Sequence, residues 1–296
     1  MVEREAVDGA RHGRAAVWRS GTYPIRRRAP RTLPRWLRRS AEFILIFSSA
    51  VADNGFMKIA AIGLDADDTL WHNEDHFAAT EEAFADLLSP WVGIETARAE
   101  LLRTETNNLH LFGYGVKSFT LSMIEAAMTL SNGEIASADL AILLERGKEM
   151  LDRPAEMLAG VEETLKTLSG SHPLLLITKG DLHHQHRKVD ESGLARWFRS
   201  VEIIREKDVA TYTDVLRRND VRPDQFVMVG NSVKSDVLPA VEIGSVGVHI
   251  PYVFTWAHEV VDHKNPGGQI RNADGGNFWE LNSIRELPAL IDRLRT

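Results

Sequence analysis

Acidic side chains are concentrated directly after an apolar segment near residue 60. The run at 59–64 is followed by Asp65-Ala66-Asp67-Asp68-Thr69-Leu70. The chain contains no Cys, so thiolate nucleophiles and thiolate metal sites are excluded, and chemistry must come from Asp, Glu, His, Lys, Ser and Thr. Asp65 and Asp67 can converge on one site only if the backbone turns out of a strand here. A turn or a helix cap is the alternative interpretation of the same pair.

Three more polar segments follow apolar runs further along the chain. They are Thr178-Lys179-Gly180, Glu206-Lys207-Asp208 and Gly230-Asn231-Ser232-Val233-Lys234-Ser235-Asp236. Each is ordinary by itself, because threonine can start a helix, lysine is usually solvated, and Gly-Asn-Ser is a common turn. Together they supply a hydroxyl group, an ammonium group and more oxygen ligands. If all four segments lie at one edge of a sheet, they predict a catalytic site around the Asp pair.

The apolar runs themselves predict a parallel sheet. Five short, nearly continuous runs are typical of strands buried on both faces, and they lie at 59–64, 174–178, 201–204, 226–229 and 246–250. Helix-like stretches at 182–192, 209–219 and 235–243 separate the last four runs, which is the spacing of repeated βαβ units. The sequence therefore predicts an α/β fold with a doubly wound parallel sheet. Ligands of such sheets bind beyond the carboxyl ends of the strands, where the polar segments lie.

The long interval between the first two predicted strands indicates an insertion. About 110 residues separate them, far more than one crossover connection needs. Apolar residues recur there at helical spacing, as in Phe77 and Phe84. We expect residues 73–153 to form a helical cap domain over the strand ends, and residues 58–72 and 154–296 to form the catalytic core.

The first 57 residues differ in composition from the rest. They contain 11 Arg and no Lys against five acidic residues, whereas the whole chain has a formal net charge of -7. No apolar period occurs before the stretch at 43–47, so we expect residues 1–57 to be a weakly structured, Arg-rich extension that folding does not need. That stretch is shorter than the roughly 7 to 15 apolar residues of a secretory signal. The acidic remainder argues against nucleic acid as a partner, and no segment approaches the roughly 18 apolar residues of a membrane span.

The four polar segments, in this order, resemble the motifs of the haloacid dehalogenase-like superfamily, in its subgroup with a helical cap after the first strand. The resemblance covers about residues 58–255 and is carried by Asp65-Ala66-Asp67-Asp68-Thr69-Leu70, Thr178, Lys207, and Gly230-Asn231 with Asp236. It implies a Rossmann-like core, Mg²⁺ as cofactor, and phosphatase activity on a small phosphorylated metabolite. Asp67 argues against dehalogenation, because the dehalogenases of this superfamily lack an acid at that position.

The resemblance also implies a role for each motif residue. Asp65 would attack phosphorus and become an aspartyl-phosphate, while Asp67 would act first as a general acid and then as a general base. Lys207 would neutralise phosphoryl charge, and the Thr178 hydroxyl and the backbone N–H of Lys179 would hold phosphoryl oxygens.

The implied metal ligands are Asp65, Asp236 and the backbone carbonyl of Asp67, with Asn231 beside them. Asn231 stands where an Asp is common, so it would reach the metal through water or orient Asp236. Lys179 stands where an Asn is more frequent, and it either favours an anionic substrate or points to solvent.

Several alternatives stay open from the sequence. A phosphomutase would keep Asp67, and a catalytically silent relative would bind a phosphorylated ligand or a protein. The polar segment 107–117 is the expected specificity loop, unless it is an ordinary helix connection. Trp71 either stacks on a substrate ring or anchors the hinge of the cap. The absence of Cys is compatible with the cytoplasmic location that we expect, and the oligomeric state is not indicated.

Overall fold

The computed structural model describes residues 58–254, 256–259 and 277–295; our expectations for residues 1–57 lie outside these ranges. The strands are β1 (Ala61–Leu64), β2 (Leu174–Lys179), β3 (Ser200–Ile204), β4 (Phe226–Gly230), β5 (Val246–His249) and β6 (Phe278–Glu280). The α-helices are α2 (Glu74–Leu87), α3 (Ile94–Phe112), α4 (Val116–Leu130), α5 (Ser137–Asp152), α6 (Val161–Ser169), α7 (Leu182–Ser192), α8 (Val209–Arg218), α9 (Leu238–Glu242) and α10 (Leu287–Leu294). Shorter helical turns are η1 (Leu194–Trp197), η2 (Pro223–Gln225), η3 (Val233–Val237), η4 (Ala257–Glu259) and η5 (Ile284–Glu286).

The strands form one parallel sheet in the order β3-β2-β1-β4-β5-β6. The predicted doubly wound α/β fold is therefore confirmed. Five strands lie within two residues of their predicted bounds, but β6 was not predicted, because an edge strand of three residues leaves little apolar pattern. In this order β1 lies between β2 and β4, so the loops that follow these three strands are neighbours.

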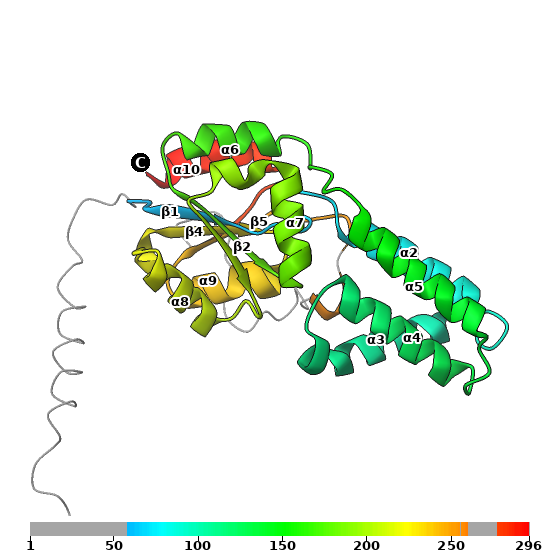
Figure 1. Ribbon diagram of the computed structural model, residues 1–296. Coiled ribbons are helices and arrows are strands. Elements are labelled where there is room, and N and C mark those ends of the chain that lie inside the picture. The colour runs from blue at the N-terminus through cyan, green and yellow to red at the C-terminus, as the bar shows by residue number, and fades with distance from the viewer. Residues whose placement is uncertain (1–57, 255, 260–276, 296) are drawn as a thin grey trace, which may run out of the picture. The chain divides into compact units, whose positions relative to one another are not determined.

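Successive strand residues face opposite sides of the sheet and enter two different cores. On one side, Ile62 and Leu64 of β1 pack in a core that includes residues of α6, α7 and α10. On the other side, Ala61 packs with residues of α8 and α9. Figure 1 shows these helices on both sides of the sheet. Burial on both faces explains why β1, β2 and β4 are almost wholly apolar, whereas the partly buried β3 contains Ser200 and Glu202.

Helices α2 to α5 lie between β1 and α6 in the chain, and we call residues 73–153 the helical insertion. Their facing sides form a hydrophobic core of their own, which contains Phe84, Leu101, Met123 and Leu143. One prediction for this region needs correction. The segment 107–117 is not a loop, since only residues 113–115 lie between α3 and α4. Both glycines of that connection have positive φ angles, 72° at Gly113 and 108° at Gly115, which favour glycine.

The helix predicted at 235–243 is also different in detail. The chain first forms the π-helical turn η3 and then the short helix α9, which has a proline within its first two positions. The backbone N–H groups of Asp236 and Val237 both point to the carbonyl oxygen of Ser232, at 2.8 and 3.4 Å. Among the described residues, no helix combines the length and the apolar character that a membrane span requires.

A close contact inside the sheet gives a first prediction. A Cβ atom added at Gly63 of β1 would overlap the ring of Phe226 and lie 3.0 Å from the sulfur of Met228. Both neighbours are buried in β4, so neither can move freely. We expect Gly63→Ala to lower the free energy of unfolding by about 1–3 kcal/mol, measured by urea denaturation.

Gly170→Ala is the matched control. Gly170 has αR dihedral angles (φ -69°, ψ -19°), and its added Cβ would meet only a backbone oxygen at 3.5 Å. Its stability should stay the same or rise slightly. Equal stability of the two variants would contradict the tight β1–β4 packing.

Candidate active site

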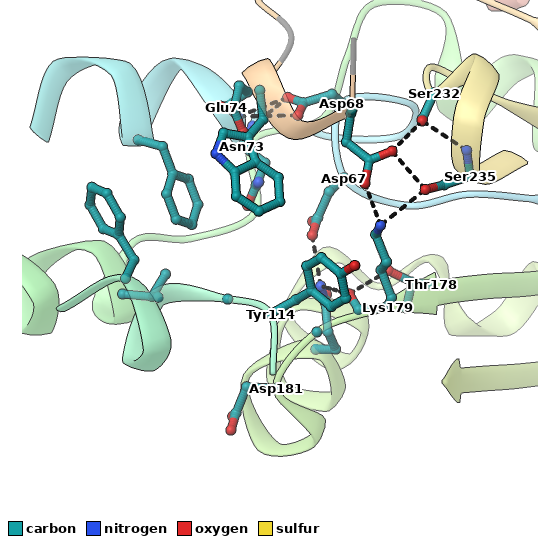
Figure 2. Close-up of a pocket in the computed structure, with 18 of the residues that line it drawn as sticks. Asp67, Asp68, Asn73, Glu74, Tyr114, Thr178, Lys179, Asp181, Ser232 and Ser235 are labelled. Atoms are coloured by element: carbon teal, nitrogen blue, oxygen red, sulfur yellow. Dashed lines mark hydrogen bonds and ion pairs between the residues drawn. The ribbon is translucent and has the colours of Figure 1, made fainter. Parts of the chain in front are cut away.

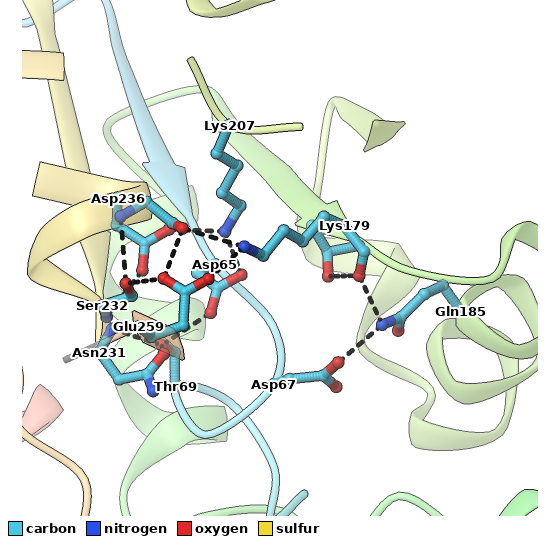
Figure 3. A network of polar contacts seen from close by, with 12 residues as sticks. Asp65, Asp67, Thr69, Lys179, Gln185, Lys207, Asn231, Ser232, Asp236 and Glu259 are labelled. Carbon is cyan, nitrogen blue, oxygen red and sulfur yellow. Dashed lines mark hydrogen bonds and ion pairs between the residues drawn. The ribbon is translucent and has the colours of Figure 1, made fainter. Parts of the chain in front are cut away.

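A buried lysine joins two carboxylates at the carboxyl ends of the strands. Asp65 follows β1, Lys207 lies between β3 and α8, and Asp236 lies in η3 after β4. The Lys207 Nζ atom donates to Asp65 Oδ1 and, at 2.6 Å, to Asp236 Oδ1, as Figure 3 shows. All three side chains are at most 8% exposed. The structure thus brings together three residues that are up to 171 positions apart in the chain.

The electrostatics of this triad follow from burial and from the excess of negative charge. Burial raises the pKa of Asp65 to about 7, because it disfavours the anion and the nearby Asp236 adds to this effect, although Lys207 opposes it. Burial also disfavours the ammonium form of Lys207, but the two carboxylates outweigh it and raise its pKa. Lys207 therefore stays charged and offsets the repulsion between Asp65 and Asp236.

The loop after β1 turns sharply and starts the helical insertion. Asp68 has a positive φ of 60°, and its carboxylate accepts the backbone N–H groups of Asn73 at 2.9 Å and Glu74 at 3.0 Å. These are the free N–H groups at the start of α2, so Asp68 acts as a helix cap. Thr69 Oγ1 donates to Asp65 Oδ2 at 3.2 Å. The same short loop therefore orients Asp65 and fixes the beginning of α2.

Asp67 lies beside the triad and accepts hydrogen bonds from three side chains. Its Oδ1 receives Trp71 Nε1 at 2.6 Å and Lys188 Nζ at 2.5 Å, and its Oδ2 receives Gln185 Nε2 at 2.7 Å. Burial alone would raise the pKa of Asp67, but the charge of Lys188 and these hydrogen bonds lower it below its ordinary value. Trp71 is fully buried, so it anchors the loop, and the alternative that it stacks on a substrate ring is wrong.

Gln185 and Lys188 were not among the predicted site residues. They lie three positions apart on α7 and therefore share one face of that helix. This spacing, on the helix predicted at 182–192, was the signal that could have found them.

Thr178 and Lys179 end β2 next to the triad. Thr178 is 1% exposed. The ammonium of Lys179 donates to Glu259 Oε1 at 2.5 Å and to Ser235 Oγ at 3.0 Å, and it lies 4.1 Å from the ring centroid of Tyr114. Lys179 points into the site, so the alternative that it points to solvent is wrong.

Glu259 of η4 was also missed, because no strand or motif precedes it in the sequence. Its Oε2 accepts hydrogen bonds from Ser232 and Ser235, both at 2.6 Å, in addition to the ion pair with Lys179. Burial opposes its ionisation, but Lys179 and the two hydroxyl groups lower its pKa to about 2. Glu259 is therefore an anion that closes the polar network on the side of β4.

Asn231 adjoins Asp65 and Asp67 of the loop after β1. With its amide nitrogen turned toward them, it donates to the backbone oxygen of Asp67 at 3.1 Å and to Asp65 Oδ2 at 3.2 Å. Within the described ranges, no three His, Asp or Glu side chains are placed to hold a metal. The available donor set is two carboxylates, of Asp65 and Asp236, and one backbone carbonyl. Such an all-oxygen set fits Mg²⁺, which usually binds one or two carboxylates and keeps several waters.

These groups line a pocket between the strand ends and the helical insertion (Figure 2). From the insertion, the Tyr114 hydroxyl donates to Glu206 at 2.7 Å, and Lys117 pairs with Asp181 at 2.9 Å. A Cβ atom at Gly115 would lie 3.3 Å from the backbone nitrogen of Asp181, so this glycine permits close approach. The α3–α4 connection thus forms one wall of the pocket.

Fold and site together define a parallel α/β core with an acidic loop after its first strand and a buried lysine that joins two carboxylates. The haloacid dehalogenase-like hydrolase family matches residues 59–244, and the chain belongs to this family of enzymes. A crystal structure of a haloacid dehalogenase-like family hydrolase from Xanthomonas campestris is 36% identical, with 82% of this chain and 95% of that chain covered and a TM-score of 0.70.

Two more distant structures show the same fold. One is a 2-haloacid dehalogenase from Pseudomonas syringae pv. Tomato DC3000, which is 22% identical, with 79% of this chain and 99% of that chain covered and a TM-score of 0.53. The other is a predicted phosphoglycolate phosphatase from Haemophilus somnus 129PT, which is 14% identical, with 80% of this chain and 100% of that chain covered and a TM-score of 0.51. A comparison with curated proteins gives no significant match. The structures that share this fold therefore include a 2-haloacid dehalogenase and a predicted phosphatase, and the choice between these two activities depends on the site.

The buried triad predicts a large effect of Lys207 on stability. Lys207→Met leaves two adjacent buried carboxylates without their cation. We expect the free energy of unfolding to fall by about 3–5 kcal/mol in urea titrations with EDTA present. Lys166→Met, an exposed change on α6, is the control and should change stability by less than about 0.5 kcal/mol. A Lys207 variant as stable as this control would contradict the triad.

Proposed function

We propose that this enzyme is a Mg²⁺-dependent phosphatase that hydrolyses a small phosphorylated metabolite through an aspartyl-phosphate at Asp65. The supporting observation is the position of Asp67, whose carboxylate lines the same pocket as Asp65. A leaving alkoxide needs a proton, and an acid beside the nucleophile can supply it. A leaving halide needs none, so dehalogenation gives no reason for this second carboxylate.

Mg²⁺ would be held by the carboxylates of Asp65 and Asp236 and by the backbone carbonyl of Asp67. When bound, it would lower the pKa of the Asp65 carboxyl and neutralise charge between that carboxylate and the phosphoryl group. Asn231 would orient these ligands, because its amide nitrogen faces Asp65 and the Asp67 carbonyl.

In the first step, an Asp65 oxygen attacks phosphorus and a new O–P bond forms while the bond to the ester oxygen breaks. Asp67 gives its proton to that ester oxygen, so the product leaves as an alcohol. Asp67 must therefore be protonated when substrate binds, although Lys188 and Gln185 favour its anion in the structure. An approaching phosphate dianion would favour the protonated form again.

In the second step, the Asp67 carboxylate takes a proton from a water molecule that attacks phosphorus. The O–P bond to Asp65 breaks, and inorganic phosphate and a free carboxylate are formed. The three donors on Asp67 suit this step, because they hold the anionic base in one position. The Thr178 hydroxyl, the backbone N–H of Lys179 and the Lys207 ammonium would hold phosphoryl oxygens throughout.

We further propose that the helical insertion, residues 73–153, acts as a cap domain over a catalytic core of residues 58–72 and 154–296. Its contacts with the core at Tyr114 and Lys117 lie beside the pocket. A cap in this position would exclude water while the phosphoryl group is transferred.

Phosphate release from p-nitrophenyl phosphate with Mg²⁺ tests the proposal. The wild type should turn over this ester, and Asp65→Asn should abolish turnover, because the amide is not a nucleophile. Circular dichroism and gel filtration should show an unchanged fold, since the shape is kept and Lys207 retains Asp236.

Asp224→Asn, at an exposed carboxylate paired with Arg222, is the control and should keep wild-type activity. Halide release from a 2-haloacid, with no phosphate release from the ester, would contradict the phosphatase. Isomerised sugar phosphate instead of free phosphate would indicate a mutase.

A further inference from the structure

The wall of the pocket formed by the helical insertion carries three glutamates, two of which have no cationic partner within the part of the chain that the structure describes. Glu74 and Glu81 of α2 and Glu105 of α3 line this wall and are partly buried. Glu81 forms an ion pair, with its Oε1 atom 3.7 Å from Arg98 Nε. Within the described residues, no hydrogen bond or ion pair joins the side chain of Glu74 or Glu105 to a lysine, arginine or histidine. Figure 2 shows Glu74 beside Asn73 at the start of α2.

The lysines of the pocket do not balance this charge, because each is already engaged by another acid. Lys207 pairs with Asp65 and Asp236, Lys188 with Asp67, and Lys179 with Glu259. Burial raises the pKa of Glu74 to about 9 and that of Glu105 to about 8, and neighbouring carboxylates add to both shifts. A bound cation would reverse these shifts and stabilise both anions.

A second acceptor in the same pocket also lacks a donor. Gln185 is 4% exposed, and its Nε2 donates to Asp67 Oδ2 at 2.7 Å and to the Lys179 carbonyl at 3.0 Å. These two acceptors fix the orientation of the amide. Its Oε1 atom is left buried without a partner, which is costly unless a ligand supplies an N–H or O–H group.

Aromatic rings line the pocket beside these glutamates; Phe77, Tyr114 and Phe119 belong to the helical insertion, and Trp256 directly precedes η4. Phe77 and Phe119 lie with ring centroids 5.0 Å apart, and Tyr114 and Trp256 with centroids 6.1 Å apart. Aromatic faces attract organic cations such as ammonium groups. This aromatic lining suits an organic cation better than a metal ion, which needs oxygen ligands and water around it.

We infer that this wall binds an organic ammonium group, so that the substrate is a phosphomonoester whose other end carries a cationic nitrogen. The assignment of the phosphate end rests on the proposed function. The ammonium end rests on Glu74, Glu105 and the aromatic rings, and an ammonium group that carries N–H could also donate to the Gln185 oxygen.

The test compares esters of equal shape that differ in charge. Phosphocholine is matched with 3,3-dimethylbutyl phosphate, in which a carbon atom replaces the quaternary nitrogen, and phosphoethanolamine is matched with propyl phosphate. We expect kcat/KM to be at least about 10-fold higher for the cationic member of one pair, and the better pair identifies a quaternary or a primary ammonium group. Equal values in both pairs would overturn the inference while leaving the phosphatase intact.

Substitutions assign the preference to the wall. Glu74→Gln and Glu105→Gln should each lower the ratio of cationic to neutral kcat/KM by at least about 5-fold. Glu95→Gln is the control, because this glutamate lies on α3 with its side chain 92% exposed, and it should leave the ratio unchanged. An unchanged ratio in both wall variants would also overturn the inference.

Binding can be measured without turnover, which separates this inference from the proposed function. Calorimetry on the full chain should detect choline or ethanolamine more strongly than 3,3-dimethylbutanol, and Glu105→Gln should weaken that binding. If no ester is hydrolysed but the cations bind in this way, the phosphatase proposal fails and the ammonium site stands. If none of these cations binds or is preferred, the ammonium site is wrong.

Discussion

Two like charges held together by one buried ammonium group are the constraint on which the site depends. Asp65 and Asp236 would repel each other in a medium of low dielectric constant, and Lys207 makes their approach possible. The strand order supplies the geometry, since β1 lies between β2 and β4 and the loops after them are adjacent. Lys207 comes from the loop after β3, one strand further away, and the length of its side chain lets it reach both carboxylates.

The acidic loop after β1 couples this chemistry to the helical insertion. Asp68 caps the first turn of α2, while the Trp71 indole is buried and donates to Asp67. One short segment therefore orients Asp65, holds the carboxylate of Asp67 and sets the start of the helices that form the opposite wall. The same loop residues therefore hydrogen-bond the buried polar groups of the core and fix where the helical insertion begins.

The sequence predicted the sheet and the triad well, because each strand is buried on both faces and each triad residue closely follows a strand. It predicted less where function depends on tertiary contact. Gln185 and Lys188 reach Asp67 only because their face of α7 is turned toward it. Glu259 reaches Lys179 from a segment whose sequence shows no periodic pattern. β6 has three residues at the sheet edge, too few for a pattern. The length of the α3–α4 connection was overestimated, because most of the polar residues at 107–117 belong to the end of α3 or the start of α4.

The central claim is a covalent phosphoryl intermediate on Asp65, and chemical trapping tests it most directly. Borohydride reduces an acyl phosphate to an alcohol, so an aspartyl-phosphate at position 65 would become homoserine. The enzyme should be quenched with borohydride during turnover of a phosphomonoester, and its peptides analysed by mass spectrometry. Our account predicts homoserine at position 65 only when substrate is present. An unmodified Asp65 in enzyme that releases phosphate, or homoserine at another aspartate, would contradict it.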